Sequence, residues 1–363
     1  MKRYILYSNG CYLNRIDTKR IEIFLKKNGY TLSDNLRDSD IIIFNTCAYC
    51  KEMEDECIKF LENIQRLKTK KSKLIIAGCL PVINKKRLLA NFRGPYFNPL
   101  SMDSLVEFIG AKHKEIDTIP TAQPILTDDN TFNQKPQKIF AIRISYGCLN
   151  RCSFCAVKNV FPKLHSKDKK EILEQFLGGL KSGYKTFLLT GEDTSCYGKD
   201  TGTDLTELLM DIVKIKSEFN IYLYRLNPDG LLKMGKDFLN VLKSKKIKYL
   251  SIPINSGSNR ILSLMNRNYK AEEIKNYIKK LKKLYPFIRL NLDIMVGFPT
   301  ETWKDFQDTQ RFVCETKPDN IRVFKFSKRP NTPAYYLGRL IPKSTMQKRS
   351  NILYKTFRFI KYK

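Results

Sequence analysis

Short apolar runs alternate with amphipathic stretches over the first 110 residues. Continuous apolar runs predict strands buried on both faces of a parallel sheet, at residues 3–7, 40–44 and 73–77. The stretches between them carry apolar residues at helical spacing and predict helices at residues 18–27, 52–68, 84–92 and 103–109. Strands that alternate with helices in this way indicate an open parallel α/β sheet.

A second alternating region follows a polar segment. Residues 113–137 are polar and contain three prolines, which predicts a linker over the surface. Beyond it, six apolar runs predict strands with helices between them, at residues 139–145, 186–190, 222–226, 249–254, 289–296 and 321–326. We therefore expect an amino-terminal domain at residues 1–112, the linker, a second α/β domain at residues 138–330 and a terminal segment at residues 331–363.

Three cysteines lie close together directly after the first strand of the second region. Cys148, Cys152 and Cys155 have the spacing C-x3-C-x2-C and follow a glycine turn. Three thiolates on one loop can hold three irons of a cubane iron-sulfur cluster and leave the fourth iron open to a small molecule. The alternatives are buried thiols or a zinc site, but zinc normally needs a fourth Cys or His, and the next histidine is His165, beyond Pro162.

A second set of cysteines is dispersed in the amino-terminal domain. Cys11, Cys47 and Cys79 each lie at or just past the carboxyl end of a predicted strand. Because the strand ends of an open α/β sheet meet at one edge, these three thiols can converge and hold a second cluster. The alternative is that each is a small buried residue, since free cysteine is among the most buried residue types.

The chain is strongly basic, with a formal net charge of +30. A field of this strength attracts polyanions such as RNA, although a coding bias toward lysine would give the same excess. From Lys328 to Lys363 the chain has ten Lys or Arg, no acid and interleaved aromatic residues, a pattern suited to phosphates and stacked bases. The alternative is a terminal helix whose apolar side packs inward, formed by Met346, Leu353, Phe357 and Ile360, and both can hold together.

The composition predicts a cytoplasmic protein with no membrane partner. No apolar run approaches the ~18 residues of a membrane span, and the amino terminus is too short for a signal peptide. Six cluster cysteines need a reducing compartment. The other four cysteines are expected to be reduced residues that fill space: Cys50, Cys57, Cys196 and Cys314.

The cysteine motifs resemble those of the radical S-adenosylmethionine (SAM) methylthiotransferases. SNGCYLN, FNTCAYC and AGCLP resemble the three amino-terminal motifs of that family, and GCLNRCSFC resembles its SAM-cluster motif. The resemblance continues through IPINSGS, LMNR, DIMVGFPTET and SKRPNTPA, so that it spans roughly residues 3 to 334. GCLN and GEDTSCYGKDTGTDL are most similar to the archaeal and eukaryotic branch, which methylthiolates threonylcarbamoyladenosine in tRNA.

The resemblance implies a fold and a set of cofactors. The fold class is α/β, with the amino-terminal open parallel sheet followed by a radical SAM partial (βα)6 barrel and a basic terminal helix. Two [4Fe-4S] clusters are implied, one on Cys148, Cys152 and Cys155 and the other on Cys11, Cys47 and Cys79. SAM would bind the open iron, one SAM would methylate sulfur on the amino-terminal cluster, and a second would supply the radical that abstracts hydrogen.

Further residues are expected to contact SAM by the same resemblance. Phe154 would pack against the cluster or the adenine, and Glu192 would accept a hydrogen bond from the SAM amino group. Residues after the fourth and fifth barrel strands would lie along the SAM, namely Ser256, Gly257, Val296 and Gly297. The alternative for these positions is a turn residue selected for its backbone geometry. Asp293 and Arg225 lie within predicted strands and are assigned structural roles.

The expected substrate is tRNA, modified at carbon 2 of the adenosine next to the anticodon, with flavodoxin or ferredoxin as electron donor. Family members normally carry a carboxyl-terminal β-barrel, the TRAM domain, and fewer than thirty residues follow Ala334. We therefore expect no such domain. Its absence motivates an alternative in which the same chemistry acts on a peptide or protein.

Overall fold

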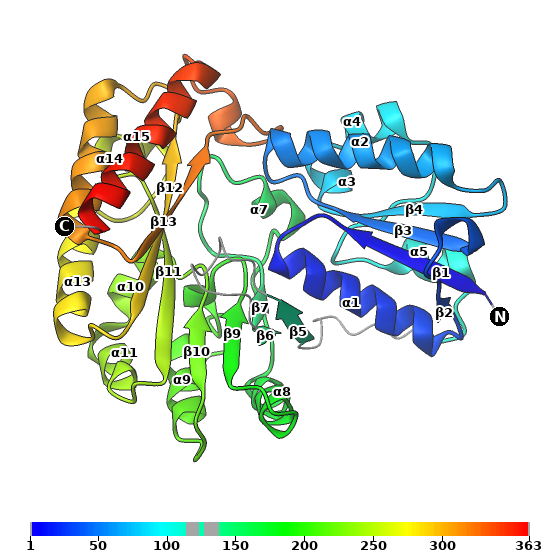
Figure 1. Ribbon diagram of the computed structural model, residues 1–363, viewed down its shortest axis with the longest axis horizontal. Helices are drawn as coiled ribbons and strands as arrows, with labels where there is room; N and C mark the ends of the chain where they lie inside the picture. The colour runs from blue at the N-terminus through cyan, green and yellow to red at the C-terminus, as the bar shows by residue number, and fades with distance from the viewer. Residues whose placement is uncertain (1, 114–122, 127–137, 362–363) are drawn as a thin grey trace. The chain divides into compact units, whose positions relative to one another are not determined.

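The computed structural model describes residues 2–113, 123–126 and 138–361 (Figure 1). The chain divides into two compact units. One comprises Met1–Gln123, Cys155–Pro162 and Ser327–Tyr335, and the other comprises Pro124–Phe154, Lys163–Phe326 and Tyr336–Lys363. The domain boundaries drawn from the sequence stay predictions, and most of the predicted linker lies outside the described residues.

The first unit is built on a four-stranded sheet in the order β2-β1-β3-β4. Its strands are β1 (Arg3–Ser8), β2 (Thr31–Leu32), β3 (Ile41–Thr46) and β4 (Lys73–Gly78). All neighbouring strands run parallel. The central strand β3 is buried along its whole length, as its continuous apolar run predicts. The open parallel sheet expected from the sequence is confirmed, with β2 as an additional short edge strand.

Helices cover both faces of this sheet, and α1 (Tyr12–Lys27) and α2 (Lys51–Leu67) lie on opposite sides (Figure 1). The helix α1 begins at Tyr12 instead of residue 18, because Tyr12, Leu13 and Ile16 are buried and extend its apolar side toward the strand end. The remaining helices of the unit are short: α3 (Leu80–Ile83), α4 (Lys85–Asn91), α5 (Asp103–Ile109), α7 (Val157–Val160), η1 (Leu36–Asp38) and η3 (Pro333–Tyr335).

The second unit contains a seven-stranded sheet in the order β13-β12-β11-β10-β9-β6-β5. Its strands are β5 (Gln123–Leu126), β6 (Lys138–Arg143), β9 (Thr186–Thr190), β10 (Asn220–Leu223), β11 (Ile247–Asn255), β12 (Arg289–Val296) and β13 (Asn320–Lys325). From β6 to β13 all neighbours are parallel and follow sequence order, as a partial (βα)6 barrel requires. The six predicted strands are therefore present.

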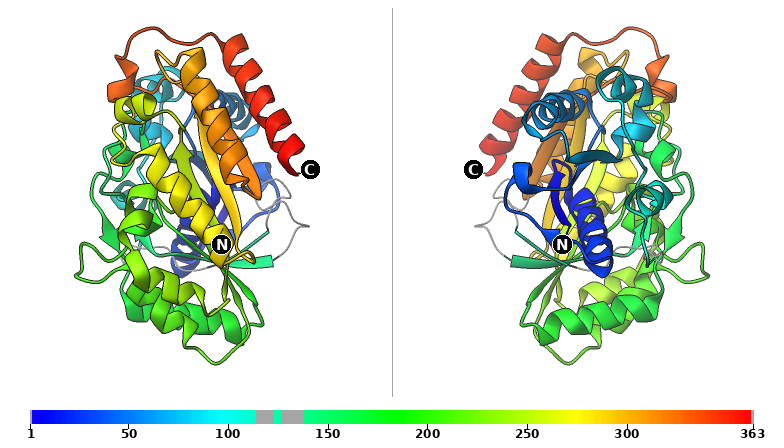
Figure 2. Two further views of the ribbon diagram at one scale, coloured as in Figure 1. Left: turned by 90° about the vertical axis from the view of Figure 1, so that its left-hand side faces the viewer. Right: turned by 90° about the vertical axis from the view of Figure 1, so that its right-hand side faces the viewer.

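The helices between these strands form an outer layer on the sheet (Figure 2). They are α8 (Lys169–Lys181), α9 (Leu205–Val213), α10 (Pro228–Lys233), α11 (Gly235–Leu242), α12 (Asn259–Leu264), α13 (Ala271–Leu284) and α14 (Trp303–Thr316). A short antiparallel pair, β7 (Ser145–Tyr146) and β8 (His165–Ser166), flanks the cysteine loop. A single turn, η2 (Thr194–Cys196), follows β9.

The structure adds one strand to the sequence-based expectations in this unit and corrects another. The strand β5 lies within the segment predicted as a linker over the surface, and the linker itself stays a prediction. The strand predicted at residues 222–226 ends at Leu223, and Arg225 lies beyond it with a φ of 62°, a left-handed conformation that a strand does not contain. Asp293, in contrast, lies within β12 and pairs with Arg322 at 2.7 Å, in agreement with its structural role.

The terminal helix α15 (Lys343–Lys361) packs against β13 and α14. Of the predicted apolar side, Met346, Leu353 and Phe357 are buried and Ile360 is half-buried, which confirms the inward side for the first three. Arg349 lies on the same side, where it forms an ion pair with the buried Glu301. The expectation that the cations of the tail face phosphate is thus wrong for Arg349. It is also wrong for Arg329, which is buried against Glu54 in the first unit.

No helix of the described residues combines the length and the apolar character that crossing a membrane requires.

The Arg349–Glu301 ion pair anchors α15. Burial disfavours the charged form of Glu301 and raises its pKa, and the guanidinium of Arg349 compensates the charge of the carboxylate. Arg349→Ala leaves this carboxylate buried without its partner, and we expect it to cost roughly 3–5 kcal/mol of unfolding free energy. Thermal unfolding followed by circular dichroism measures the change. Arg358→Ala, on the exposed side of the same helix, is the control and should stay within about 0.5 kcal/mol of the parent. Equal effects of the two substitutions would contradict the anchoring role.

Candidate iron-sulfur and SAM site

The three amino-terminal cysteines follow three neighbouring strands of the first unit. Cys11 caps the amino terminus of α1 after β1, Cys47 directly follows β3, and Cys79 directly follows β4. Because β1, β3 and β4 are parallel, these strand ends share one edge of the sheet. The backbone N–H of Cys79 also donates to the carbonyl of Thr46 at 2.9 Å, which ties the second and third cysteine positions together.

A glycine permits the close approach of these two strand ends. Gly78 has a φ of 96°, and a Cβ there would lie 2.3 Å from the carbonyl oxygen of Thr46. No other residue fits this position without moving the backbone. The glycine before Cys79 is therefore a steric requirement of the cysteine edge.

The thiols at this edge are close enough to affect one another electrostatically. Burial, followed by the charge of Cys11, raises the pKa of the Cys47 thiol to about 12. Two neighbouring thiolates are therefore unfavourable by themselves, and a bound metal that neutralises them removes the penalty. Cys57 lies next to Cys47, and its buried thiol donates to the carbonyl of Cys47 at 3.0 Å.

The part of the C-x3-C-x2-C loop that lies in the second unit, with Cys148 and Cys152, begins at a sterically constrained glycine. Gly147 has a φ of 76°, and a Cβ there would lie 1.9 Å from the carbonyl oxygen of Lys163. Its N–H donates to Glu192 Oε2 at 2.9 Å, and Oε1 of the same carboxylate pairs with the fully buried Arg143. The guanidinium of Arg143 also lies 3.6 Å from the centre of the Tyr146 ring. Glu192 thus holds the start of the loop. The partners that the structure gives its carboxylate are Gly147 and Arg143.

Two sulfurs of the loop, those of Cys148 and Cys152, accept hydrogen bonds from nitrogen donors. The backbone N–H and the side-chain amide of Asn150 donate to Cys148 Sγ at 3.3 and 3.2 Å. Arg267 Nη1 donates to Cys152 Sγ at 3.3 Å. Hydrogen bonds to cysteine sulfur stabilise the thiolate form and influence the potential of an iron-sulfur cluster. Cys148 and Cys152 thus each have a hydrogen-bond donor directed at the sulfur, as the sulfur ligands of iron-sulfur clusters commonly do.

Arg267 and Asn150 contact sulfurs of the cysteine loop, and sequence reasoning missed both of them. Asn150 lies between the first two cysteines of the loop, so its amide could have been considered from its position alone. Arg267 belongs to the LMNR segment, which carried the family resemblance without an assigned role. Its contact with Cys152 spans 115 positions and depends on the folded barrel.

Ser256 and Gly257 lie after β11 and are held by α14. The hydroxyls of Ser256 and Thr309 are 3.2 Å apart, and the N–H of Gly257 donates to Thr309 Oγ1 at 3.0 Å. A Cβ at Gly257 would lie 2.7 Å from the carbonyl oxygen of Asp308, so only glycine fits. In these contacts both residues stabilise the turn and its packing against α14. This is the alternative expected from the sequence, a turn residue selected for its backbone geometry.

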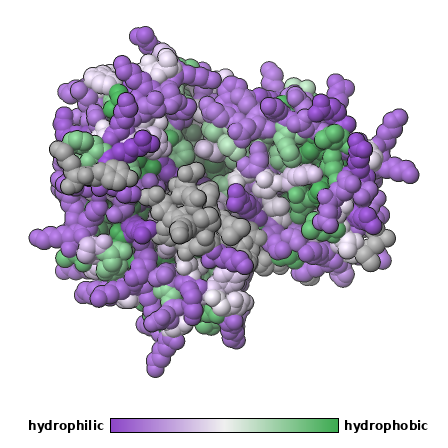
Figure 3. Space-filling view, in the orientation of Figure 1, coloured by the Kyte–Doolittle hydropathy of each residue, from purple (hydrophilic) through white to green (hydrophobic). Residues whose placement is uncertain are grey.

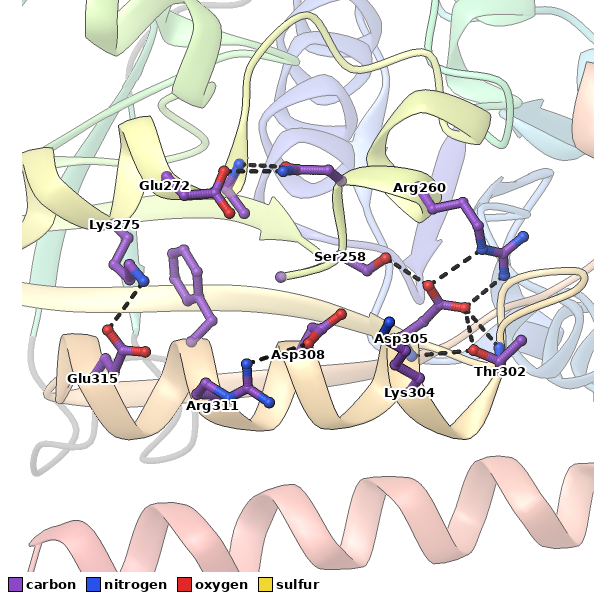
Figure 4. A pocket seen from close by; sticks show the side chains of 14 residues that line it. Ser258, Arg260, Glu272, Lys275, Thr302, Lys304, Asp305, Asp308, Arg311 and Glu315 are labelled. Atoms are coloured by element: carbon purple, nitrogen blue, oxygen red, sulfur yellow. Dashed lines mark hydrogen bonds and ion pairs between the residues drawn. The ribbon is translucent and has the colours of Figure 1, made fainter.

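A cavity of about 390 Å³ lies on the outer side of this turn, between α12, α13 and α14 (Figure 4). Gly257 contributes to its wall, and Asp305 closes one end by pairing with Arg260 at 2.5 Å and accepting from Ser258 at 2.6 Å. The remaining charged side chains of the wall come mainly from the helices: Glu272, Lys275, Lys304, Asp308, Arg311 and Glu315. The opposite charges of this wall largely compensate one another.

Val296 and Gly297 mark the end of β12. Val296 is buried, and its carbonyl accepts from the N–H of Phe326 at 2.9 Å. Gly297 has a φ of 77°, and its N–H donates to Glu301 Oε2 at 2.8 Å. The turn is thereby connected to the buried pair that anchors α15. Phe154 is half-buried in the loop between Cys152 and Cys155.

Cys196 was expected only to fill space, but the structure brings it to the cysteine loop. It lies in η2 after β9, and hydrogen bonding from its thiol lowers the pKa of Cys148. The same hydrogen bond, burial and the charge of Asp193 raise the pKa of Cys196. The GEDTSCYG segment contains both Asp193 and Cys196, so their spacing is visible in the sequence, while their proximity to Cys148 is not.

Family models match both parts of the chain. Residues 142–313 match the radical SAM superfamily, and residues 3–95 match a family described as uncharacterized protein family UPF0004. In the structural comparison, the radical SAM methyltransferase TsrM from Kitasatospora setae superposes with a TM-score of 0.63 at 14% identity, covering 92% of this chain and 77% of that chain. At this identity the similarity concerns the fold alone.

Curated relatives match nearly the whole chain. It is 30% identical to a probable threonylcarbamoyladenosine tRNA methylthiotransferase of Pyrococcus horikoshii, over 98% of this chain and 84% of the relative. It is 30% identical to a ribosomal protein methylthiotransferase of Thermodesulfovibrio yellowstonii, over 97% of this chain and 81% of the relative. It is likewise 30% identical to a tRNA-2-methylthio-N(6)-dimethylallyladenosine synthase of Acetivibrio thermocellus, over 98% of this chain and 76% of the relative. With its α/β units and cysteine motifs, the chain therefore belongs to the radical SAM methylthiotransferase family, enzymes that use SAM and [4Fe-4S] clusters.

Proposed function

We propose that this enzyme adds a methylthio group to carbon 2 of threonylcarbamoyladenosine next to the tRNA anticodon, with two [4Fe-4S] clusters and two molecules of SAM. The observation that carries the proposal is the presence of two separate three-cysteine sets, each at the carboxyl ends of parallel strands. Several relatives at about 30% identity bear the name of this tRNA activity.

In this proposal Cys148, Cys152 and Cys155 hold the SAM cluster, and Cys11, Cys47 and Cys79 hold the auxiliary cluster. When bound, the first cluster supplies the electron that cleaves SAM. The chain's own residues then have defined tasks. Gly147 and Glu192 shape the loop, while Asn150 and Arg267 donate hydrogen bonds to its sulfurs.

The SAM contacts expected from the family resemblance belong to the proposal as well. A carboxylate has about four acceptor sites, so Glu192 can hold Gly147 and Arg143 and still accept from the SAM amino group. Phe154 would cover the cluster or the adenine, and Ser256, Gly257, Val296 and Gly297 would line the SAM through their turns. Flavodoxin or ferredoxin would supply the electrons.

The tRNA assignment is supported by the exposed side of α15. Lys348, Lys355 and Arg358 are exposed there, and Tyr354 and Phe359 lie among them with exposed rings. Cations that contact phosphate and rings that stack on bases suit an unpaired RNA loop. Hydrophilic residues dominate the face of the molecule drawn in Figure 3.

Nucleoside mass spectrometry tests the substrate directly. We expect tRNA from a strain that lacks this gene to contain threonylcarbamoyladenosine without its methylthio group, and the purified enzyme to restore the group with SAM and a reductant. The variant Cys152→Ala, which lacks one ligand of the SAM cluster, is the matched control and should restore nothing. An unchanged nucleoside profile together with a changed peptide mass would replace tRNA by a protein substrate.

Iron content tests the two-cluster arrangement. Anaerobic reconstitution with iron and sulfide should give about eight irons per chain, as two [4Fe-4S] clusters require. Cys79→Ala and Cys152→Ala should each reduce the content to about four, because each removes one ligand from a different set. Cys314→Ala, at an exposed thiol of α14, is the control and should keep about eight. About four irons in the parent, insensitive to Cys79→Ala, would exclude the auxiliary cluster.

Salt dependence tests the exposed side of α15. In the triple variant Lys348→Ala, Lys355→Ala and Arg358→Ala we expect weaker tRNA binding, and a slope of log affinity against log salt that flattens by roughly 0.7–0.9 per lost phosphate contact. The control triple removes three exposed lysines of α11 and α13, namely Lys236, Lys280 and Lys283. Parallel slopes for the two triples would show that α15 is only a structural cap.

A further inference from the structure

One carboxylate oxygen of the second unit lies within hydrogen-bonding distance of two thiols. Asp193 Oδ2 lies 3.5 Å from Cys148 Sγ and 3.2 Å from Cys196 Sγ. The two sulfurs and the carboxylate oxygen all lie within 4.8 Å of one another, and Asp193 and Cys196 are buried. Two thiols that converge on a carboxylate form a three-ligand set of the kind that binds a divalent metal.

The distances agree with a tetrahedral metal site. With a metal–sulfur bond of about 2.3 Å and a metal–oxygen bond of about 2.0 Å, tetrahedral angles separate sulfur and oxygen by about 3.5 Å. The two sulfur–oxygen distances in the structure are already close to this value. We propose that Cys148, Asp193 and Cys196 bind one thiophilic divalent ion, of the Zn²⁺ or Fe²⁺ class, when the loop carries no cluster.

The carboxylate is held in place by its other hydrogen bonds. Asp193 Oδ1 accepts from the N–H and the hydroxyl of Ser195, at 3.0 and 2.6 Å, and from the N–H of Asn227 at 3.4 Å. The amide of Asn150 donates to Oδ2 at 2.7 Å. Oδ2 therefore stays directed at the sulfurs, as the outer hydrogen bonds of metal ligands usually ensure.

An adjoining cavity gives access to this site. It has a volume of about 300 Å³, and Cys196 and Asn150 contribute to its wall. The ion would replace two thiol protons, so that two protons are released for each ion bound and the charge of the occupied site is −1. Three cations at the cavity wall can offset this charge: Arg151, Lys199 and Lys233.

The site and the proposed SAM cluster share Cys148, so they exclude each other. An ion held here occupies Cys148, so that this thiolate is not available to a cluster on Cys152 and Cys155. The inference concerns the cluster-free chain and needs neither SAM nor tRNA, so it can fail or succeed independently of the proposed function.

Titration of the cluster-free, full-length chain with Co²⁺ under anaerobic conditions tests the site. The intensity of the thiolate-to-cobalt charge-transfer absorption reports the bound ion, and added Zn²⁺ should displace it. We expect Cys196→Ser and Asp193→Asn each to weaken this binding by about 100-fold or more. Loss of a residue that only hydrogen-bonds to a metal ligand already costs about 10- to 100-fold in affinity, and these two residues are proposed as ligands themselves. Binding should also strengthen as pH rises, because protons are released.

Two matched variants separate this site from other thiols. Cys152→Ala removes a cysteine of the same loop that is not a proposed ligand, and Cys314→Ala removes an exposed thiol elsewhere. Both should bind Co²⁺ as the parent does, while any ion at the amino-terminal cysteines contributes equally to all variants. If Cys152→Ala weakens binding and Cys196→Ser does not, the ion sits on the three loop cysteines and the proposal is wrong. Parent-like binding in both Cys196→Ser and Asp193→Asn would overturn it as well.

Discussion

The carboxylate of Glu192 connects the end of the first barrel strand to the start of the cysteine loop. One oxygen pairs with Arg143, whose side chain is fully buried at the end of β6, and the other accepts the N–H of Gly147. A buried guanidinium needs such a partner, because an uncompensated charge in the interior is strongly destabilising. This one side chain therefore links the end of β6 to the residue directly before Cys148.

Glycine geometry makes that connection specific. At Gly147 and at Gly78 a Cβ would collide with a backbone carbonyl, of Lys163 and Thr46 respectively. Both glycines directly precede a cysteine and have positive φ angles. One cysteine of each set, Cys79 and Cys148, is thus presented in the same way, by a glycine at a strand end that turns the chain.

Buried ion pairs divide the basic residues of this chain into two classes. Arg349 anchors α15 to Glu301, and Arg329 is held by Glu54 within the other unit. These arginines stabilise the fold and cannot contact a polyanion. Lys348, Lys355 and Arg358 extend from the exposed side of α15 and remain accessible. A net charge of +30 therefore overstates the cationic surface available to any polyanion, and the orientation of each cation decides its role.

The sequence by itself determined the features that are local or periodic. Apolar runs predicted β1, β3, β4 and the six barrel strands, helical spacing predicted the apolar side of α15, and the cysteine motifs predicted the family. The two-residue strand β2, the strand β5 and the early start of α1 at Tyr12 escaped prediction, because short elements and helix ends depend on packing partners far away in sequence.

Only the tertiary structure decided which polar groups meet. Arg267 reaches Cys152 across 115 positions, and Cys196 meets Cys148 because β9 lies beside β6. Sequence reasoning assigned Cys196 to filling space and counted Arg329 and Arg349 among the cations suited to phosphate, since residue type and local spacing carry no information about a partner on another element. Hydrogen bonds and ion pairs act over a few ångströms, so their partners are fixed only when the strands have paired and the helices have packed.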